Sequence, residues 1–166
     1  MFLCGPISDE PRTTNHAPRP TNLGVPMLIT PHLDHFALAA ADTDAMVAWY
    51  GKVLGLVVHA QTNPTPPQTQ KAYLIGPPIT HGHSGIRHGS MIEVMPCNNT
   101  SRHHRSNTDP GLSHIAFYVP DFDAALDHLK SCNVKFLGDV VEALGGGRLV
   151  SFADCEANMI QIVERK

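Results

Sequence analysis

The chain has 166 residues, of which 42% are hydrophobic and 16% are charged, and its formal net charge is -3. This length and apolar content predict one domain, or one domain made of two similar halves, with a substantial core. There is no basic surplus of the kind that binds nucleic acid. No stretch reaches the roughly 20 apolar residues that a membrane helix needs. We therefore expect neither nucleic acid nor a membrane as a partner.

The four cysteines show neither CxxC pairing nor the spacing of a disulfide framework, which favours a reduced, intracellular protein. The apolar run Met1–Cys4 is too short for a signal peptide, so a cytoplasmic location is expected. Residues 1–30 carry five prolines among polar residues, which predicts an extended or disordered N-terminal arm. The alternative for this arm is a strap over a neighbouring subunit.

The first periodic segment begins after Pro31. Over Leu33–Ala40 the residues alternate in the period of a strand, with the histidine on one face and bulky apolar residues on the other. A helix is then predicted to begin at Asp42 and to end at Gly55. Its apolar face has helical spacing and comprises Met46, Trp49, Tyr50 and Val53. Three more strands are predicted, at Leu56–Gln61, Lys71–Ile75 and Ser90–Met95.

The same pattern restarts after a polar linker, residues 98–111. At an offset of 79 positions (114 − 35 = 79), His35 aligns with His114 and Asp42 with Asp121, without gaps. A second apolar helical face follows, and it comprises Phe122, Ala125, Leu126 and Leu129. Further strands are predicted near Val134–Phe136, Arg148–Ala153 and Asn158–Val163. We therefore predict an internal duplication, with one module at about 32–97 and the other at about 112–165.

Four polar side chains interrupt the apolar strands of these two modules. His35 and His114 share a strand face with small alanines, which leaves room for a ligand. A carboxylate in an apolar strand, such as Glu93, is costly without a partner. Gln161 is placed on the last strand as Glu93 is on the fourth. A metal ion held by these residues would supply the partner, whereas hydrogen-bonded histidines and a solvated glutamate are the alternative.

The segment from His35 through Asp42 and Trp49-Tyr50 to Leu56, together with the closing Asp154–Glu164, resembles the vicinal oxygen chelate superfamily. That superfamily includes glyoxalase I, extradiol dioxygenases and bleomycin resistance proteins. The resemblance implies an α+β domain over residues 31–166, in which two tandem βαβββ modules form an open, curved eight-stranded mixed sheet around a pocket. The helices lie on the outer face. The family's metal-ligand positions fall on His35, Glu93, His114 and Gln161.

The resemblance implies a metal-dependent enzyme of the glyoxalase type, a lyase or isomerase acting on a small substrate with vicinal oxygens. Proton transfer would pass through an enediolate, assisted by a divalent ion of nickel, zinc, cobalt, manganese or iron. Gln161 stands where glyoxalase I carries a glutamate, and an amide cannot take a proton. Glu93 is therefore the expected catalytic base. Members of the superfamily often dimerise, so a homodimer is one expected assembly.

Two other functions stay open on the sequence. The first is a ferrous-iron, ring-cleaving dioxygenase that uses His35, His114 and Glu93 as a facial triad. The second is a protein that binds and sequesters a small molecule without catalysis, as in bleomycin resistance. Tyr118 is interpreted as a packed aromatic, with a hydrogen bond to substrate as the alternative. The loop histidines are interpreted as solvated, with adventitious metal binding as the alternative; they are His81, His83, His88 and His103-His104. Gly145-Gly146-Gly147 is interpreted as a hairpin connection, and Cys155 is not expected to be a nucleophile.

Overall fold

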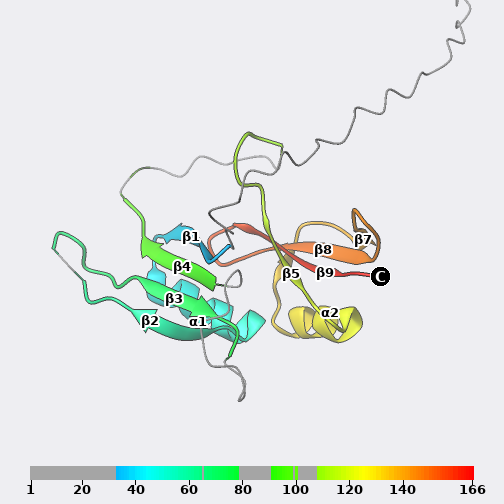
Figure 1. Ribbon diagram of the computed structural model, residues 1–166, viewed down its shortest axis with the longest axis horizontal. Coiled ribbons are helices and arrows are strands. Elements are labelled where there is room, and N and C mark those ends of the chain that lie inside the picture. Colours follow the sequence, from blue (N-terminus) through cyan, green and yellow to red (C-terminus); the bar gives the residue numbers. More distant parts are fainter. Residues whose placement is uncertain (1–32, 65, 79–90, 99, 101–107) are drawn as a thin grey trace, which may run out of the picture. The chain divides into compact units, whose positions relative to one another are not determined.

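The computed structural model describes residues 33–64, 66–78, 91–98, 100 and 108–166. The arm predicted for residues 1–30 and the loop histidines at 81, 83, 88, 103 and 104 lie outside the described residues. The elements, in chain order, are β1 (His35–Ala40), α1 (Thr43–Leu54), β2 (Val57–Gln61), β3 (Tyr73–Gly76), β4 (Met91–Pro96), β5 (Ile115–Tyr118), α2 (Phe122–Ser131), β6 (Lys135–Phe136), β7 (Val141–Glu142), β8 (Arg148–Ala153) and β9 (Met159–Glu164) (Figure 1).

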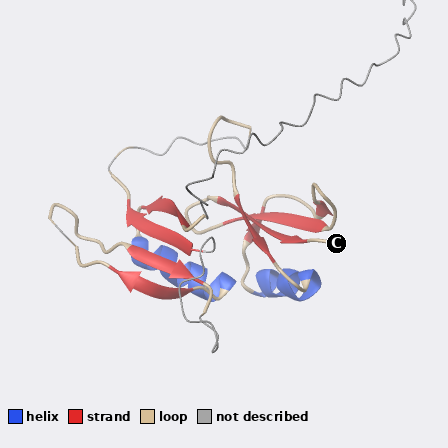
Figure 2. Cartoon of the chain, viewed as in Figure 1, coloured by secondary structure: helices blue, strands red, loops and turns tan. Residues whose placement is uncertain are grey.

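The two modules have the same topology. In the first, the strand order is β1-β4-β3-β2, with β1 parallel to β4 and the other pairs antiparallel. In the second, the order β5-β9-β8-β6 repeats this arrangement, and the short β7 also pairs with β8. One helix covers one face of each sheet (Figure 2). The prediction of tandem βαβββ modules is confirmed, and the described strands form two hydrogen-bonded sheets.

Equivalent aspartates begin both helices. Asp42 Oδ1 accepts a hydrogen bond from the Ala45 N–H at 2.9 Å, and Asp121 Oδ1 accepts one from the Ala124 N–H at 2.9 Å. Each cap satisfies one of the backbone donors that a helix leaves unpaired at its first turn. Gly55 ends α1 with φ 68°, a left-handed conformation that glycine adopts at little cost. The predicted beginning and end of the first helix are thus confirmed.

Several strand boundaries differ from those predicted. β1 begins at His35 rather than at Leu33, and β5 begins at Ile115, so His114 lies just before its strand. β4 continues through Pro96 instead of ending before it. The strand β7 was not predicted, because two residues are too few to show an alternating pattern. These differences move strand ends by one to three residues and leave the faces unchanged.

Alternation along β1 divides the open face of the sheet from the core. Leu38 and Ala40 are buried, whereas His35, Ala37 and Ala39 are exposed. The buried residues of both modules form one hydrophobic cluster, whose largest side chains include Tyr50, Phe122 and Phe152. The histidine face predicted from the sequence therefore lies away from the helix and open to a ligand.

A turn between β8 and β9 joins the second module to α1 of the first. The Tyr50 hydroxyl on α1 donates to Asp154 Oδ2 at 3.1 Å, and both side chains are buried. In the same turn, Glu156 Oε1 accepts from the Ala41 N–H at 2.7 Å and from the Asp42 N–H at 3.1 Å. Because a carboxylate near a helix N-terminus also interacts favourably with the helix dipole, this turn stabilises the start of α1.

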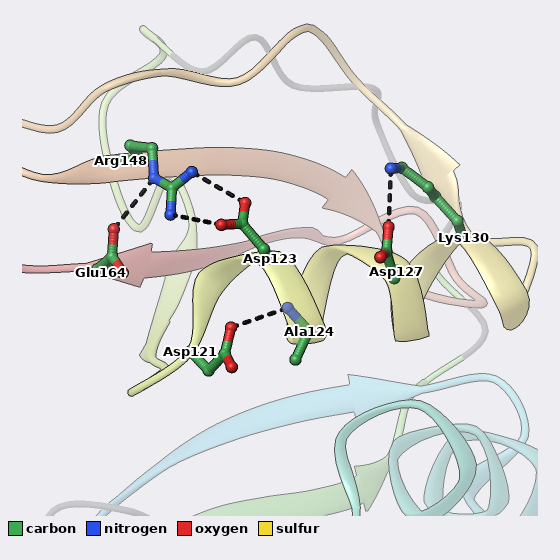
Figure 3. Close-up of polar contacts among 7 residues, drawn as sticks. All are labelled: Asp121, Asp123, Ala124, Asp127, Lys130, Arg148 and Glu164. Atoms are coloured by element: carbon green, nitrogen blue, oxygen red, sulfur yellow. Dashed lines mark hydrogen bonds and ion pairs between the residues drawn. The ribbon is translucent and has the colours of Figure 1, made fainter.

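Arg148 ties α2 to the sheet of the second module (Figure 3). Its guanidinium donates to both carboxylate oxygens of Asp123 on α2, at 2.9 and 3.3 Å, and to Glu164 on β9 at 3.0 Å. The same group lies 4.7 Å from the centre of the Phe122 ring. A planar guanidinium can make all of these contacts together. Arg148 is therefore a structural residue that orients α2.

Positive φ angles occur in the turns on both sides of β8. Gly147 has φ +92°, and a Cβ atom there would lie 1.9 Å from the Glu164 carbonyl oxygen, so only glycine fits beside β9. The three predicted glycines do join β7 to β8 as a hairpin connection. Ala157, in the turn between β8 and β9, adopts φ 63°. This left-handed conformation costs an L-residue roughly 1–2 kcal/mol.

Candidate functional site

Strand register places the four predicted ligand residues at equivalent points of the two modules. Glu93 on β4 pairs with Ala37 on β1, and Gln161 on β9 pairs with Ala116 on β5. Each histidine lies two residues before the paired alanine, and residues two apart in a strand share a face. The duplication predicted from an offset in the sequence is therefore also a duplication of strand register.

In the first module, the structure brings His35 and Glu93 together. His35 Nε2 lies 3.5 Å from Glu93 Oε2 across two adjacent parallel strands. The two side chains are 41% and 36% exposed. Because Glu93 is partly exposed on the open face, solvent hydrates its carboxylate, and burial alone does not force it to have a partner. A nitrogen and an oxygen donor nevertheless face each other here.

The His35–Glu93 pair opens onto a cavity of about 260 Å³. Its walls come from the ends of β1 and β2, from β3 and from β4, and the lining residues are Asp34, His35, Ala60, Gln61, Thr62, Ala72, Tyr73, Leu74 and Glu93. Drug-sized ligands occupy pockets of about 300–1,000 Å³, so this cavity suits a smaller molecule. Its lining combines apolar residues with a few polar groups, as small-molecule sites do.

Tyr73 is held at the wall of this cavity by α1. Its hydroxyl hydrogen-bonds to Asp44 Oδ1, and this bond raises the pKa of the Tyr73 hydroxyl above its usual value. The hydroxyl is thus protonated at neutral pH. It is also already engaged as a donor to Asp44, and the side chain belongs to the hydrophobic core, so we assign Tyr73 a structural role rather than one in proton transfer.

The second module holds its pair differently. The Gln161 Nε2 amide donates to Ser151 Oγ at 3.0 Å, which leaves the amide oxygen as the group able to bind a cation. His114 Nδ1 lies 3.2 Å from Ser113 Oγ. Neither His114 nor Gln161 lines the cavity of the first module. Within the described ranges, no three His, Cys, Asp or Glu side chains lie close enough to hold one metal ion.

Asp34 shapes the electrostatics of the first pair. Its Oδ2 lies 2.8 Å from His35 Nδ1. This hydrogen bond, with smaller contributions from the charges of Asp34 and Glu93, raises the pKa of His35 above its ordinary value. Both carboxylates favour the protonated, positively charged form of His35. A metal ion bound to His35 would therefore have to compete with a proton as the pH falls.

Sequence reasoning missed some of these residues and misplaced another. Asp34 precedes the first histidine directly, but the direction of its side chain cannot be read from its position in the sequence. Tyr118, predicted to be a packed aromatic, is 64% exposed, so that interpretation is wrong.

The pKa of the Cys155 thiol is raised to about 11, by burial first and then by neighbouring carboxylates, so the thiol stays protonated. This agrees with the prediction that Cys155 is no nucleophile.

The chain belongs to the Glyoxalase/Bleomycin resistance protein/Dioxygenase superfamily, whose sequence pattern it matches over residues 32–162. The resemblance drawn from the opening and closing motifs is thereby confirmed. No curated protein sequence matches the chain significantly. Among the helices of the described residues, none has the length and apolar character to cross a membrane.

Solved structures with this fold include proteins with different activities. A mutant of the fosfomycin resistance protein FosX from Listeria monocytogenes, complexed with Mn(II) and 1S,2S-dihydroxypropylphosphonic acid, is 16% identical, with 83% of this chain and 95% of that chain covered and a TM-score of 0.59. TnmS3, an antibiotic binding protein from Streptomyces sp. CB03234, is 18% identical, with coverage of 84% and 99% and a TM-score of 0.58. Lactoylglutathione lyase from Agrobacterium tumefaciens is 21% identical, with coverage of 81% and 94% and a TM-score of 0.52. At these identities the similarity establishes the fold alone.

Proposed function

We propose that this protein is a metal-dependent enzyme of the glyoxalase type, which moves a proton on a small substrate with vicinal oxygens. The observation that carries the proposal is the His35–Glu93 pair, whose nitrogen and oxygen donors face each other at 3.5 Å beside a small open cavity. A histidine and a carboxylate on neighbouring strands are suitable ligands for a divalent transition metal. The cytoplasm is the proposed location, because Cys97, Cys132 and Cys155 are free thiols.

Each module would supply two of the four proposed protein ligands. His35 Nε2 and Glu93 would bind from the first module, and His114 and the Gln161 amide oxygen would bind from the second. The cavity beside His35 is lined by residues of the first module, which is compatible with a second pair contributed by the second module of another copy. We propose a homodimer in which the open sheet faces of two copies complete each other's sites.

The side chains then have separate roles in the reaction. A bound divalent ion would polarise the two vicinal oxygens of the substrate and make the adjacent C–H more acidic. Glu93 is the group that accepts this proton and returns it to the neighbouring carbon, because Gln161 has no basic site. Ala60, Ala72 and Leu74 line the same cavity and would give the substrate an apolar surface to bind.

A non-catalytic binding protein is the second candidate function. One observation favours it: the described part of the chain contains no cluster of three metal-binding side chains. TnmS3, an antibiotic binding protein, has a similar fold, which supports this candidate. In this case the same cavity would hold a small molecule without changing it, and Glu93 would serve as a hydrogen-bond acceptor.

Hydrogen exchange separates the two functions and can be followed on simple model compounds. Metal-loaded protein is incubated in D2O with α-hydroxy ketones such as dihydroxyacetone, and the C–H beside the vicinal oxygens is followed by proton NMR. We expect protein-dependent replacement of that hydrogen by deuterium, which stops when the metal is chelated. Saturable binding of these compounds without any exchange would instead identify a binding protein.

A further inference from the structure

Each of the two histidines is contacted by the side chain that directly precedes it. Asp34 Oδ2 lies 2.8 Å from His35 Nδ1, and Ser113 Oγ lies 3.2 Å from His114 Nδ1. Asp34 and Ser113 are themselves equivalent at the offset of 79 positions (113 − 34 = 79). The duplicated modules thus keep the geometry of this contact but differ in its chemistry.

A carboxylate and a hydroxyl constrain an imidazole ring differently. An ionised carboxylate only accepts hydrogen bonds, so the contact with Asp34 requires the proton of a neutral His35 to be on Nδ1. The lone pair is then on Nε2, the atom that faces Glu93 at 3.5 Å. The hydroxyl of Ser113 can donate or accept, and it leaves both tautomers of His114 open.

We propose that Asp34 is a positioning residue that fixes His35 with Nε2 directed toward the metal, so that His35 is the better prepared of the two histidine ligands. This inference rests on the proposed metal-dependent function. Carboxylates that accept the second N–H of a ligating histidine fix its tautomer and ring orientation, and their loss typically costs about 10–100-fold in metal affinity. The Ser113 hydroxyl constrains the tautomer and ring orientation of His114 less strongly, because it can either donate or accept.

The first experiment measures the tautomer directly and needs no metal. Two-bond nitrogen–proton NMR correlations are recorded on metal-free, 15N-labelled protein at a pH at which His35 is neutral, with assignment by the His35→Ala variant. We expect the Nδ1–H form of His35 in the natural protein and a shift toward the Nε2–H form, which free histidine prefers, in Asp34→Asn. A predominant Nε2–H form in the natural protein would overturn the proposal.

The second experiment measures metal affinity by calorimetric titration with cobalt(II) alone. Asp34→Asn is expected to weaken binding about 10–100-fold, and Asp34→Ser, which copies the pair of the second module, should weaken it similarly. Ser113→Ala is the matched control and should have a smaller effect. Because the Asp34 side chain is half exposed, these variants should keep the fold, which circular dichroism checks.

The outcomes separate this inference from the function on which it rests. A natural protein that binds no cobalt contradicts the metal-dependent function, whereas the tautomer measurement still tests the contact with Asp34. Binding that is equally tight in the natural protein and in Asp34→Asn overturns the positioning role and leaves the metal site standing. An effect of Ser113→Ala as large as that of Asp34→Asn would overturn the proposed difference between the histidines.

Discussion

The Glu93→Gln variant is expected to lose about 10²–10⁴-fold in turnover at saturating metal, which is the usual contribution of a positioned general base. Glutamine keeps the length of the side chain and an oxygen able to bind a cation, but it cannot take a proton. The strand register can accommodate the change, because Gln161 occupies the equivalent place opposite Ala116 in the second module. Deuterium exchange into an α-hydroxy ketone, with metal content determined in parallel, measures the effect.

A matched control uses the same substitution at a carboxylate outside the cavity. Glu142 on β7 is exposed and does not line the cavity beside His35, so Glu142→Gln should exchange hydrogen at the rate of the natural protein. If Glu93→Gln retains full activity while it holds its metal, Glu93 is not the base. A loss of metal together with turnover would show that Glu93 acts mainly as a ligand.

The Asp154→Ala variant is expected to lose on the order of 3–5 kcal/mol of unfolding free energy, because the buried Tyr50 donor left without an acceptor costs about 1–3 kcal/mol and the three part-buried donors, which water can reach, cost less each. The Asp154 carboxylate is 6% exposed. It accepts hydrogen bonds from the Tyr50 hydroxyl at 3.1 Å, from the Asn158 side chain at 2.6 Å, and from the backbone N–H groups of Glu156 and Asn158 at 3.0 and 2.8 Å. Urea unfolding measures the loss.

The control for this prediction removes a single bond of the same network. Burial and the nearby Asp154 carboxylate raise the pKa of the Tyr50 hydroxyl far above its ordinary value, so it acts as a donor at every physiological pH. Tyr50→Phe deletes that donor and should cost only about 1–2 kcal/mol. An Asp154→Ala variant as stable as Tyr50→Phe would mean that the β8–β9 turn does not depend on this carboxylate.

The local patterns of the sequence predicted much of the fold. Alternation along β1 separated Leu38 and Ala40 from the face that carries His35, because a strand turns alternate residues to opposite sides. Asp42 and Gly55 marked the two ends of α1, since capping depends on residues within one turn of the helix. The repeated register could be predicted for the same reason: both modules use equivalent local signals.

The candidate site was predicted only in part. The proximity of Glu93 to His35 follows from the parallel neighbouring strands β4 and β1, which the βαβββ pattern implies. The position of His114 and Gln161 relative to the His35–Glu93 pair depends on how modules pack together. No local pattern of residues determines that packing. The contact between Asp34 and His35 depends on side-chain rotamers. The exposure of Tyr118 likewise depends on what lies over its sheet, which the alternation of β5 does not reveal.

The metal content of untagged protein tests the central claim most directly. Metal-free protein is dialysed against nickel, zinc, cobalt or manganese and analysed by mass spectrometry, next to the variants His35→Ala and His128→Ala. His128 serves as the control for loss of a histidine that is not a proposed ligand. Its ring hydrogen-bonds to the Val53 carbonyl of α1, and it does not line the cavity. We predict a stoichiometric divalent ion in the natural protein and in His128→Ala, and its loss in His35→Ala. Natural protein that takes up none of the four metals, or a His35→Ala variant that retains its metal in full, would contradict the account.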